Sequence, residues 1–284
     1  MSIRRLDIVV GDNPLGPRIP FVVESEGIQV ARGDLMAKSW IGDETGRLVT
    51  VQWEPGNREA GRLIVEAAIA AAAPGDVLNA ATNAHNHADP QDRIALFESR
   101  GFELWQEKEG FWWADEGQDL PAPQRITTRR LGEVGVDRFA DLLTTCSTGT
   151  LDRVDADAMA SMGASAWAHA FLNACEDSTW LMAEDSDGRA VGFVAVGEFD
   201  PGVGTITYIG VAPECRGRGY VDDLLRVANR TARELGFRAM LSDTDTLNLP
   251  MRQAFGRNGH SSQATAWHKW MHRRTVFVDA AGPN

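Results

Sequence analysis

Cysteine is scarce in this sequence. Its three cysteines, Cys146, Cys175 and Cys215, lie far apart and form no CxxC pair. An odd number of cysteines at wide spacing indicates neither a disulfide framework nor a cysteine-rich zinc site. We therefore expect a protein of the reducing cytoplasm that holds no metal.

Long hydrophobic runs are also missing. The longest apolar stretch, residues 63–73, contains Glu66 and is about half as long as a membrane span. The apolar run near the N-terminus is short and interrupted by Asp7, unlike the hydrophobic segment of a signal peptide. These absences predict no membrane partner and no secretion.

Positive charge is in deficit. The chain of 284 residues has 28 Lys and Arg against 40 Asp and Glu, a net charge of −12. This balance argues against a general electrostatic grip on nucleic acid. With 43% hydrophobic and 24% charged residues, the composition is typical of a globular protein. The length leaves room for two domains.

A linker is predicted at residues 115–124, DEGQDLPAPQ, which are acidic, contain proline and lack apolar periodicity. It separates a first domain, residues 1–114, from a second, residues 125–284. Acidity is concentrated on the first side: residues 1–124 have 11 basic and 20 acidic groups, against 17 and 20 in residues 125–284.

The two halves repeat each other weakly but in order. Residues 46–67 and 204–225 both read as a β-rich strand, a proline, a loop with arginine and glycine, and a helix. The matching pairs, all 158 residues apart, are Pro55 and Pro213, Arg58 and Arg216, Gly61 and Gly219, Phe97 and Phe255, and Gly101 and Gly259. This order predicts two related domains.

The hydrophobic pattern predicts an α/β (α+β) fold with a mixed central sheet flanked by helices. In the second half, strands are expected at 124–131, 179–185, 188–199, 205–213, 239–245 and 265–272, and helices near 137–145, 156–175, 221–235 and 250–258. In the first half, strands fit 4–10, 20–25 and 46–53, with no pair of amphipathic helices between them. The first copy therefore reads as truncated.

The loop Arg216-Gly217-Arg218-Gly219-Tyr220 carries the clearest chemical signal. Glycines let the backbone approach a ligand, amides at a helix N-terminus attract anions, and arginines suit phosphate. A pyrophosphate is the expected ligand, and the alternative is a tight turn with solvated arginines. Neither GxxxxGK[ST] nor GxGxxG fits.

This strand, loop and helix resemble motif A of the GNAT (Gcn5-related N-acetyltransferase) superfamily, Gln/Arg-x-x-Gly-x-Gly/Ala, here Arg216, Gly219 and Val221. Val221 replaces the small residue of the motif. The first-half loop, with Arg58 and Gly61, resembles a degenerate copy that caps the active site or shapes the acceptor pocket. A tandem of this sort is similar to mycothiol synthase and to certain antibiotic N-acetyltransferases.

The resemblance implies acetyl-CoA as co-substrate. Backbone amides around Ile209 and Val211 would pair with the pantetheine arm, and Asn248 would contact the same arm. The amides and side chains of the loop would hold the pyrophosphate; its residues are Arg216, Gly217, Arg218, Gly219, Tyr220 and Val221.

The acid and base are left open by the sequence. Phe255 stands where the family often places a tyrosine acid. Tyr208, Ser242 or a water could replace it, or no acid is needed, since a coenzyme A thiolate is a tolerable leaving group. Asp243 and Asp245, at the end of a predicted strand, are candidate bases, with turn and cap roles as the alternative. Glu198 and Asp200 are reserves.

The function predicted is acetyl transfer from acetyl-CoA to the amine of a small, cationic metabolite, for example an amino-bearing antibiotic or its precursor, by direct attack in a ternary complex. Two alternatives stay open. One is a GNAT pair that binds acyl-CoA or a partner without turnover, and the other is a longer or carrier-borne acyl donor. We expect a monomer or homodimer.

Overall fold

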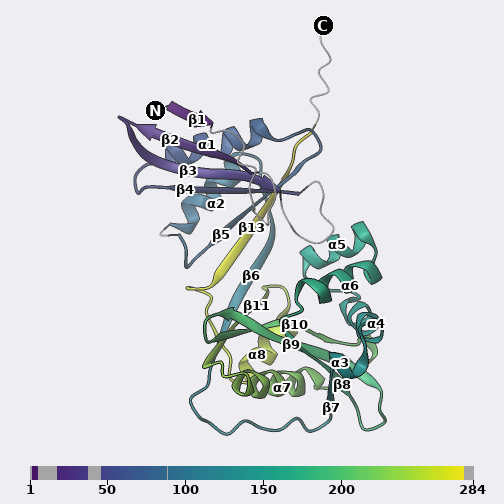
Figure 1. Ribbon diagram of the computed structural model, residues 1–284. Coiled ribbons are helices and arrows are strands. Elements are labelled where there is room, and N and C mark those ends of the chain that lie inside the picture. Colours follow the sequence, from purple (N-terminus) through teal and green to yellow (C-terminus); the bar gives the residue numbers. More distant parts are fainter. Residues whose placement is uncertain (1, 6–17, 38–45, 88, 278–284) are drawn as a thin grey trace. The chain divides into compact units, whose positions relative to one another are not determined.

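The computed structural model describes residues 2–5, 18–37, 46–87 and 89–277, drawn in Figure 1. The chain divides into two compact units, one made of Met1–Glu107 with Lys269–Asn284 and the other of Lys108–His268. Each unit is a mostly antiparallel sheet with helices against it. The predicted α/β class is confirmed.

The first unit begins with four strands that pair in chain order. They are β1 (Ser2–Arg5), β2 (Arg18–Ser25), β3 (Ile28–Ala37) and β4 (Gly46–Trp53). The chain continues through α1 (Arg58–Ala71), β5 (Val77–Asn83), α2 (Pro90–Ser99) and β6 (Glu103–Ala114). Strand β5 lies parallel to β4. Among the described residues no helix precedes α1, in agreement with the predicted truncation.

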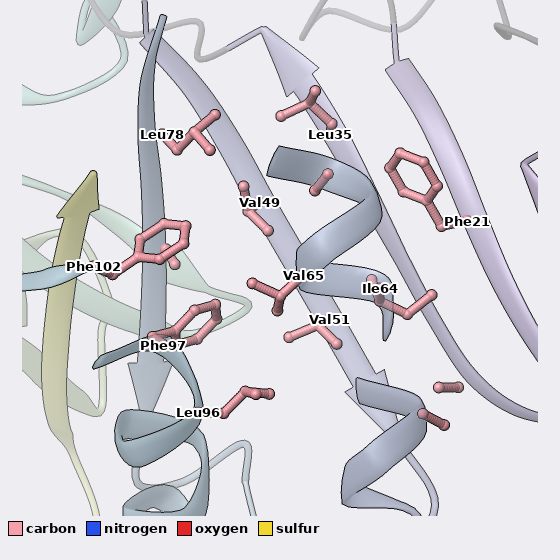
Figure 2. Packing of buried hydrophobic residues seen from close by; sticks show 14 of the residues in the cluster. Phe21, Leu35, Val49, Val51, Ile64, Val65, Leu78, Leu96, Phe97 and Phe102 are labelled. Carbon is pink, nitrogen blue, oxygen red and sulfur yellow. The ribbon is translucent and has the colours of Figure 1, made fainter. Parts of the chain in front are cut away.

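The core of the first unit forms where α1 packs on the strands (Figure 2). The inward face of α1 presents Ala60, Ile64, Val65 and Ala68 at helical spacing. Alternate residues of the strands meet this face, among them Phe21, Val23, Val49, Val51, Leu78 and Ala80. Burying one such large side chain contributes about 1.5–3 kcal/mol, so this core stabilises the unit by itself.

The second unit has a sheet in the order β6-β11-β10-β9-β8-β7. Its strands after β6 are β7 (Thr127–Arg130), β8 (Thr179–Glu184), β9 (Ala190–Asp200), β10 (Val203–Val211), β11 (Ala239–Asp245) and the short β12 (Ser261–Ser262). Its helices are α3 (Leu131–Val134), α4 (Val136–Ser147), α5 (Arg153–Met162), α6 (Ala164–Ala174), the 3₁₀ turn η1 (Pro213–Cys215), α7 (Tyr220–Glu234) and α8 (Leu249–Arg257).

The structure corrects the sequence prediction in several places. The single helix expected over 156–175 is broken into α5 and α6 at Gly163, which adopts a φ of 87°. Strands β3 and β5 were not expected, and part of the strand expected over 4–10 lies outside the described residues. The helix expected over 221–235 is confirmed as α7.

The last strand of each sequence half pairs with a strand of the other half. Strand β13 (His268–Thr275), expected to complete the second half, pairs antiparallel with β5. Residues Lys108–Ala114 of β6 pair with β11. The compact units therefore do not follow the division into 1–114, 115–124 and 125–284, which stays a prediction about sequence copies. Pairing between distant strands leaves no local pattern in the sequence.

The equivalent elements of the two sequence copies share two structural features. In both copies a strand is joined through a helix to a parallel neighbour: β4 to β5 and β10 to β11. The next helix begins alike in both, with Asp89 before Pro90 in α2 and Asn248 before Pro250 in α8. In each helix the side chain of the cap residue accepts a hydrogen bond from the backbone N–H of the residue three positions later.

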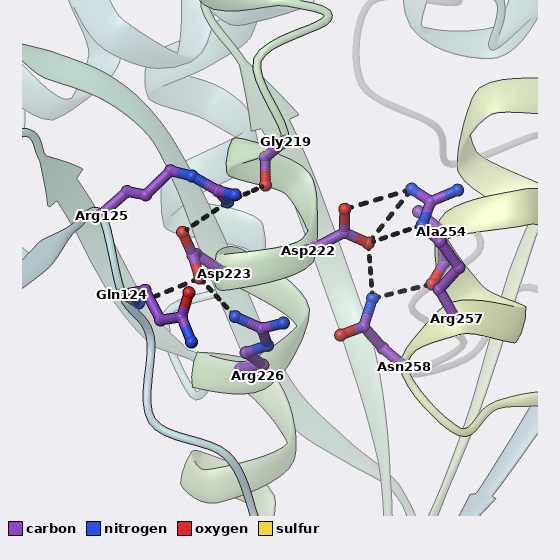
Figure 3. Close-up of polar contacts among 9 residues, drawn as sticks. All are labelled: Gln124, Arg125, Gly219, Asp222, Asp223, Arg226, Ala254, Arg257 and Asn258. Atoms are coloured by element: carbon purple, nitrogen blue, oxygen red, sulfur yellow. Dashed lines mark hydrogen bonds and ion pairs between the residues drawn. The ribbon is translucent and has the colours of Figure 1, made fainter.

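The first turn of α7 is held by two adjacent aspartates (Figure 3). Asp223, fully buried, accepts hydrogen bonds from the Gln124 backbone N–H (3.0 Å), Arg125 (3.2 Å) and Arg226 (2.9 Å). Arg125 also donates to the Gly219 carbonyl (3.2 Å). These bonds fasten the end of the predicted linker to the loop before α7.

Asp222 makes the second set of contacts. Its carboxylate accepts from Arg257 Nε (3.1 Å) and Asn258 Nδ2 (2.8 Å), at the end of α8. Arg257 is half exposed, so this pair is worth less than the buried one. Together the two aspartates fix the start of α7 against α8 and the chain around residue 124.

The described residues contain no helix that is both long and apolar enough to cross a membrane.

We predict that Asp223→Ala lowers the free energy of unfolding by about 2–4 kcal/mol, because it removes a fully buried carboxylate that accepts from the Gln124 backbone N–H and from two arginines. The matched control, Asp222→Ala, lowers it by about 1 kcal/mol or less, because that ion pair is exposed. Urea unfolding of the two variants measures the difference. Equal losses would contradict the assignment of Asp223 as the main anchor of α7.

Candidate functional site

The sheet of the second unit opens between β10 and β11. These parallel strands pair only at Val203–Gly204 with Ala239–Met240. At the next step the backbone N–H of Ile206 donates to the Ser242 side chain (2.9 Å) in place of a strand partner. An irregularity in the pairing with β9 follows, between Ile206 and Tyr208. Beyond this point one edge of β10 is unpaired.

Val211 directs its backbone N–H and carbonyl to that free edge, where the carbonyl accepts a hydrogen bond from Arg216 Nε (3.1 Å). The N–H of Ala212 points the other way, to the Val191 carbonyl (2.9 Å), and successive peptide groups of a strand alternate between its two edges. Ile209, two residues before Val211, faces the same edge. An extended ligand lying along β10 would find donors and acceptors there, which is where these two residues were predicted to bind.

The loop after β10 presents a row of backbone donors. Gly219 has a φ of 81° and stands before α7, which begins at Tyr220. No hydrogen bond joins the backbone N–H groups of residues 217–221 to another residue in the described part of the chain. Unpaired amides at a helix N-terminus, with the helix dipole behind them, form an anion site. The predicted loop thus has the geometry to hold a phosphate.

The two arginines of the loop lie in different surroundings. Arg216 donates to the carbonyls of Val211 (3.1 Å), Cys146 (3.0 Å) and Thr148 (2.9 Å), and so fastens the end of α4 to the loop. Arg218 is exposed. Arg216 therefore supports the shape of the loop, and Arg218 is the guanidinium that can reach a bound anion. Val221 is half-buried beside them.

Of the polar residues predicted at the end of β11, some are engaged in holding the backbone and others are accessible to solvent. Asp245 is buried and accepts the Leu247 backbone N–H (2.7 Å), which matches its alternative role in a turn. Asn248 caps α8 by accepting the Met251 N–H (3.3 Å). Asp243 is exposed, with its carboxylate 3.5 Å from Lys108 Nζ. Of the two predicted bases, only Asp243 is open to solvent.

Tyr208 lies in an aromatic cluster on β10. Its ring stacks on Phe193 with the centroids 5.6 Å apart and meets Phe171 and Trp167 edge-on. Its hydroxyl lies 3.1 Å from Ser147 Oγ. The buried Asp155 carboxyl lies close enough to influence the pKa of the phenol.

Four residues near Tyr208 form a charged cluster that the sequence prediction missed. We call Lys108, Asp152, Asp155 and Asp243 the lysine-aspartate cluster. Lys108 Nζ lies 2.6 Å from Asp152 and 3.5 Å from Asp243. The Asp155 side chain is buried at the start of α5. Lys108 thus forms ion pairs with two carboxylates, and the buried Asp155 carboxyl acts on it electrostatically.

Burial and neighbouring charges shift the pKa values of the ionisable groups in and beside this cluster. Burial, with Asp152 adding to it, raises the pKa of Asp155 to about 7, although Tyr208 and Lys108 oppose the shift. Burial and the neighbouring Asp155 raise the pKa of Tyr208 well above its usual value. Burial alone would lower the pKa of Lys108, but Asp243 and Asp152 raise it overall. At neutral pH, Asp155 is the group that exchanges a proton most readily.

A partial sequence signal existed for the missed residues. Asp155 and Ala158 are the buried residues of α5, so a carboxyl takes a place that helical spacing gives to the core. Lys108 lies in a strand otherwise rich in aromatic residues. No spacing rule joins residue 108 to residue 155, because the fold brings distant segments together.

Phe255 occupies a core position. It is 1% exposed, and its ring stacks on Phe111 with the centroids 4.7 Å apart. No hydroxyl can act from this position. The acid of the reaction, if a side chain supplies it, must come from another element.

Other side chains considered in the sequence lie apart from this chemistry. Cys215 is buried. His260 is buried against Asn229 (2.9 Å), and burial lowers its pKa to about 4. Among the described residues no group of three or more His, Cys, Asp or Glu side chains is placed to hold a metal ion.

Known proteins share this architecture. Residues 138–260 match the model of the acetyltransferase (GNAT) family. No curated protein matches the chain. Among solved structures, a GCN5-related N-acetyltransferase from Sphaerobacter thermophilus is similar, with 18% identity, 92% of this chain and 81% of that chain covered, and a TM-score of 0.62.

Two further structures are also similar in fold. One is a tandem GNAT protein from the clavulanic acid biosynthesis pathway, with 16% identity, 95% and 85% coverage of this and that chain, and a TM-score of 0.58. The other is a GCN5-related N-acetyltransferase from Kribbella flavida, with 13% identity, 89% and 87% coverage, and a TM-score of 0.57. The open edge of β10 and the amide loop both lie within the segment that matches the GNAT acetyltransferase family, and the similar solved structures share its fold.

Proposed function

We propose that this protein transfers an acetyl group from acetyl-CoA to the amine of a small cationic metabolite. The observation that carries the proposal is the row of unpaired amides at residues 217–221, directly after the free edge of β10. A diphosphate with an extended amide-bearing arm matches the two features in order. The acceptor could be an amino-bearing antibiotic or its precursor.

The residues of the chain fit the cofactor in three parts. The peptide groups of Ile209 and Val211 would pair with the pantetheine arm at the free edge. The amides of Gly217 to Val221 would hold the pyrophosphate, with Arg218 adding a charged donor. Asn248, the cap of α8, would contact the arm from the β11 side. The thioester supplies an activated acyl group with a good leaving thiolate.

In the reaction, the neutral acceptor amine attacks the thioester carbonyl carbon. The C–N bond forms and the C–S bond breaks; the nitrogen, positively charged after the attack, releases a proton to give the amide, and coenzyme A leaves as a thiolate that takes up one proton. An amine that is cationic in solution must first lose one proton. The protein therefore has to bind an ammonium ion and accept a proton from it.

The lysine-aspartate cluster meets both needs. Asp243 is exposed at the end of β11, and its carboxylate would attract the ammonium group. Asp155 would accept the proton through a bridging water, because it is buried and its pKa lies at about 7. A base works best when its pKa is near the working pH. We favour these two over Asp245, whose carboxylate is bound in a turn.

Tyr208 would position Asp155. Its phenol lies beside the Asp155 carboxyl and holds its own proton tightly, because burial and that carboxyl raise the pKa of the phenol. A phenol of raised pKa is a weak acid toward a thiolate, so solvent would protonate the leaving coenzyme A. Tyr208 as the acid is the alternative, and Tyr208→Phe distinguishes them: the positioning role predicts an altered pH profile, and the acid role a pH-independent fall in kcat.

We predict that kcat/KM rises with pH through about 7, because only deprotonated Asp155 can accept the amine proton and its folded-state pKa lies there. Asp155→Asn should lower kcat about 10²- to 10⁴-fold and remove the rise. The control is Asp157→Asn, an exposed carboxyl on the same helix. Steady-state assays of coenzyme A release from pH 5 to 9 measure both. An unchanged profile in Asp155→Asn would contradict the assignment.

We predict that Gly219→Glu weakens acetyl-CoA binding at least about 100-fold, because it places a carboxylate among the phosphate-binding amides. The matched control is Gly236→Glu, at the other end of α7. Gly236 has a φ of 82°, against 81° for Gly219, and nothing lies near its Cβ position. Both variants therefore carry the same backbone strain. Isothermal titration with acetyl-CoA compares them, and equal affinities would show that the loop is assigned wrongly.

A further inference from the structure

The first unit contains a cleft that acyl transfer does not use. Its volume is about 710 Å³, a size that suits a small-molecule ligand. It is formed by the start of β3, the end of β4 with the turn that follows, and the start of α2. Trp53, His87 and Arg93 supply its aromatic and cationic side chains.

This cleft lies beside the loop after β4, which corresponds in sequence to the loop at residues 216–221, but the two loops differ in structure. Helix α1 begins at Arg58, the counterpart of Arg216, whereas α7 begins only at Tyr220. The amides of Ala60 and Gly61 are already bonded to the Asn57 carbonyl (2.9 and 3.3 Å). The row of free amides that could hold a diphosphate is therefore missing from this part of the first unit.

Trp53 also fills the space that a diphosphate would need. It is the counterpart of Val211, 158 residues earlier. Its indole packs so closely over Gly61 that a Cβ atom there would overlap the ring. Glu59, paired with Arg62, adds a negative charge at the start of α1. The first unit is thus closed to coenzyme A at this loop.

Arg93 is the feature that points to another ligand. It is 5% exposed, and its guanidinium lies 4.9 Å from the centroid of the Trp53 ring. Its Nε has no hydrogen-bond partner, and no ion pair joins Arg93 to any described residue. A buried guanidinium without a counter-ion is unfavourable unless something binds it. Burial without compensation also lowers the pKa of Arg93 to about 10.

The other charged groups of the cleft limit what can bind. Glu54, Asp89 and Asp92 line it together with Arg32 and His87. Asp92 is paired with Arg58 at 3.7 Å, and Arg32 donates to Gln52 (2.9 Å). Three carboxylates around one unpaired guanidinium disfavour a dianion. A single negative charge balances Arg93.

We propose that this cleft binds a small organic monocarboxylate, whose carboxylate pairs with Arg93 and whose carbon skeleton lies against Trp53. The planar fork of arginine matches a carboxylate with two parallel hydrogen bonds. The indole supplies an apolar wall that inorganic anions do not need. The site is independent of the acetyl-transfer site and of the function proposed for it.

The test uses the full chain and phenylacetate as the probe. Isothermal titration should give a Kd of about 1 mM or tighter. Phenylacetamide, which lacks the charge, and phenyl phosphate, which carries a second one, should each bind at least about tenfold more weakly. Equal binding of the amide, tighter binding of the phosphate, or no binding of phenylacetate would each overturn the proposal.

Arg93→Met separates a ligand site from a structural role. It keeps the side-chain length and removes the unpaired charge, so phenylacetate affinity should fall at least about tenfold while the ligand-free protein unfolds at the same or a higher urea concentration. Arg32→Met, at an exposed arginine of the same cleft, should bind as the wild type does. Unchanged binding in Arg93→Met, or a clear loss of its stability, would contradict the proposal.

A second readout locates the bound anion. Burial and then Arg93 lower the pKa of His87. A carboxylate on Arg93 cancels part of that charge, so phenylacetate should raise the pKa of His87, as measured by NMR titration of its ring protons. A His87 pKa unaffected by saturating phenylacetate would place the ligand elsewhere.

Discussion

The separation of β10 from β11 is the constraint on which the rest of the site depends. Two residue pairs join the strands at Val203–Gly204, and the Ser242 side chain then takes the Ile206 N–H. Beyond this point the backbone groups of β10 that face away from β9 have no strand partner among the described residues. An unpaired edge beside a loop of unpaired amides is a binding surface for an extended ligand that ends in phosphate. The aspartates of α7 keep that loop in place.

The same framework has diverged in the two copies. Where the second has Val211, a free loop and Gly219, the first has Trp53, an earlier helix start and a covered Gly61. The tryptophan and the earlier helix start leave the first unit without the row of free amides that we propose as the phosphate site of the second. In its place an unpaired arginine faces a cleft. The acidity of the first half is therefore a weaker guide to its ligand than this one buried cation.

Sequence reasoning predicted the parts that local pattern controls. The loop from Arg216 to Val221 and the amphipathic helix after it have a glycine, arginine and apolar order that only a strand-loop-helix unit explains. It missed Lys108 and Asp155, because these meet through strand pairing between distant segments. For the same reason, the sequence did not predict that β6 and β13 pair with strands of the other half. The sequence contains Gly163 at the break, but the apolar residues on both sides of it follow helical spacing, and this pattern favoured one helix over two.

The central claim is direct acetyl transfer to a cationic amine, and one measurement tests it most directly. The protein is incubated with acetyl-CoA and a panel of cationic amines and their neutral analogues, and products are resolved by mass while free coenzyme A is quantified. The account predicts acetylated cationic amine and coenzyme A in equal amounts, with little product from the neutral analogues. Tight binding of acetyl-CoA without any acetylated amine would contradict it and indicate a protein that binds acyl-CoA without turnover.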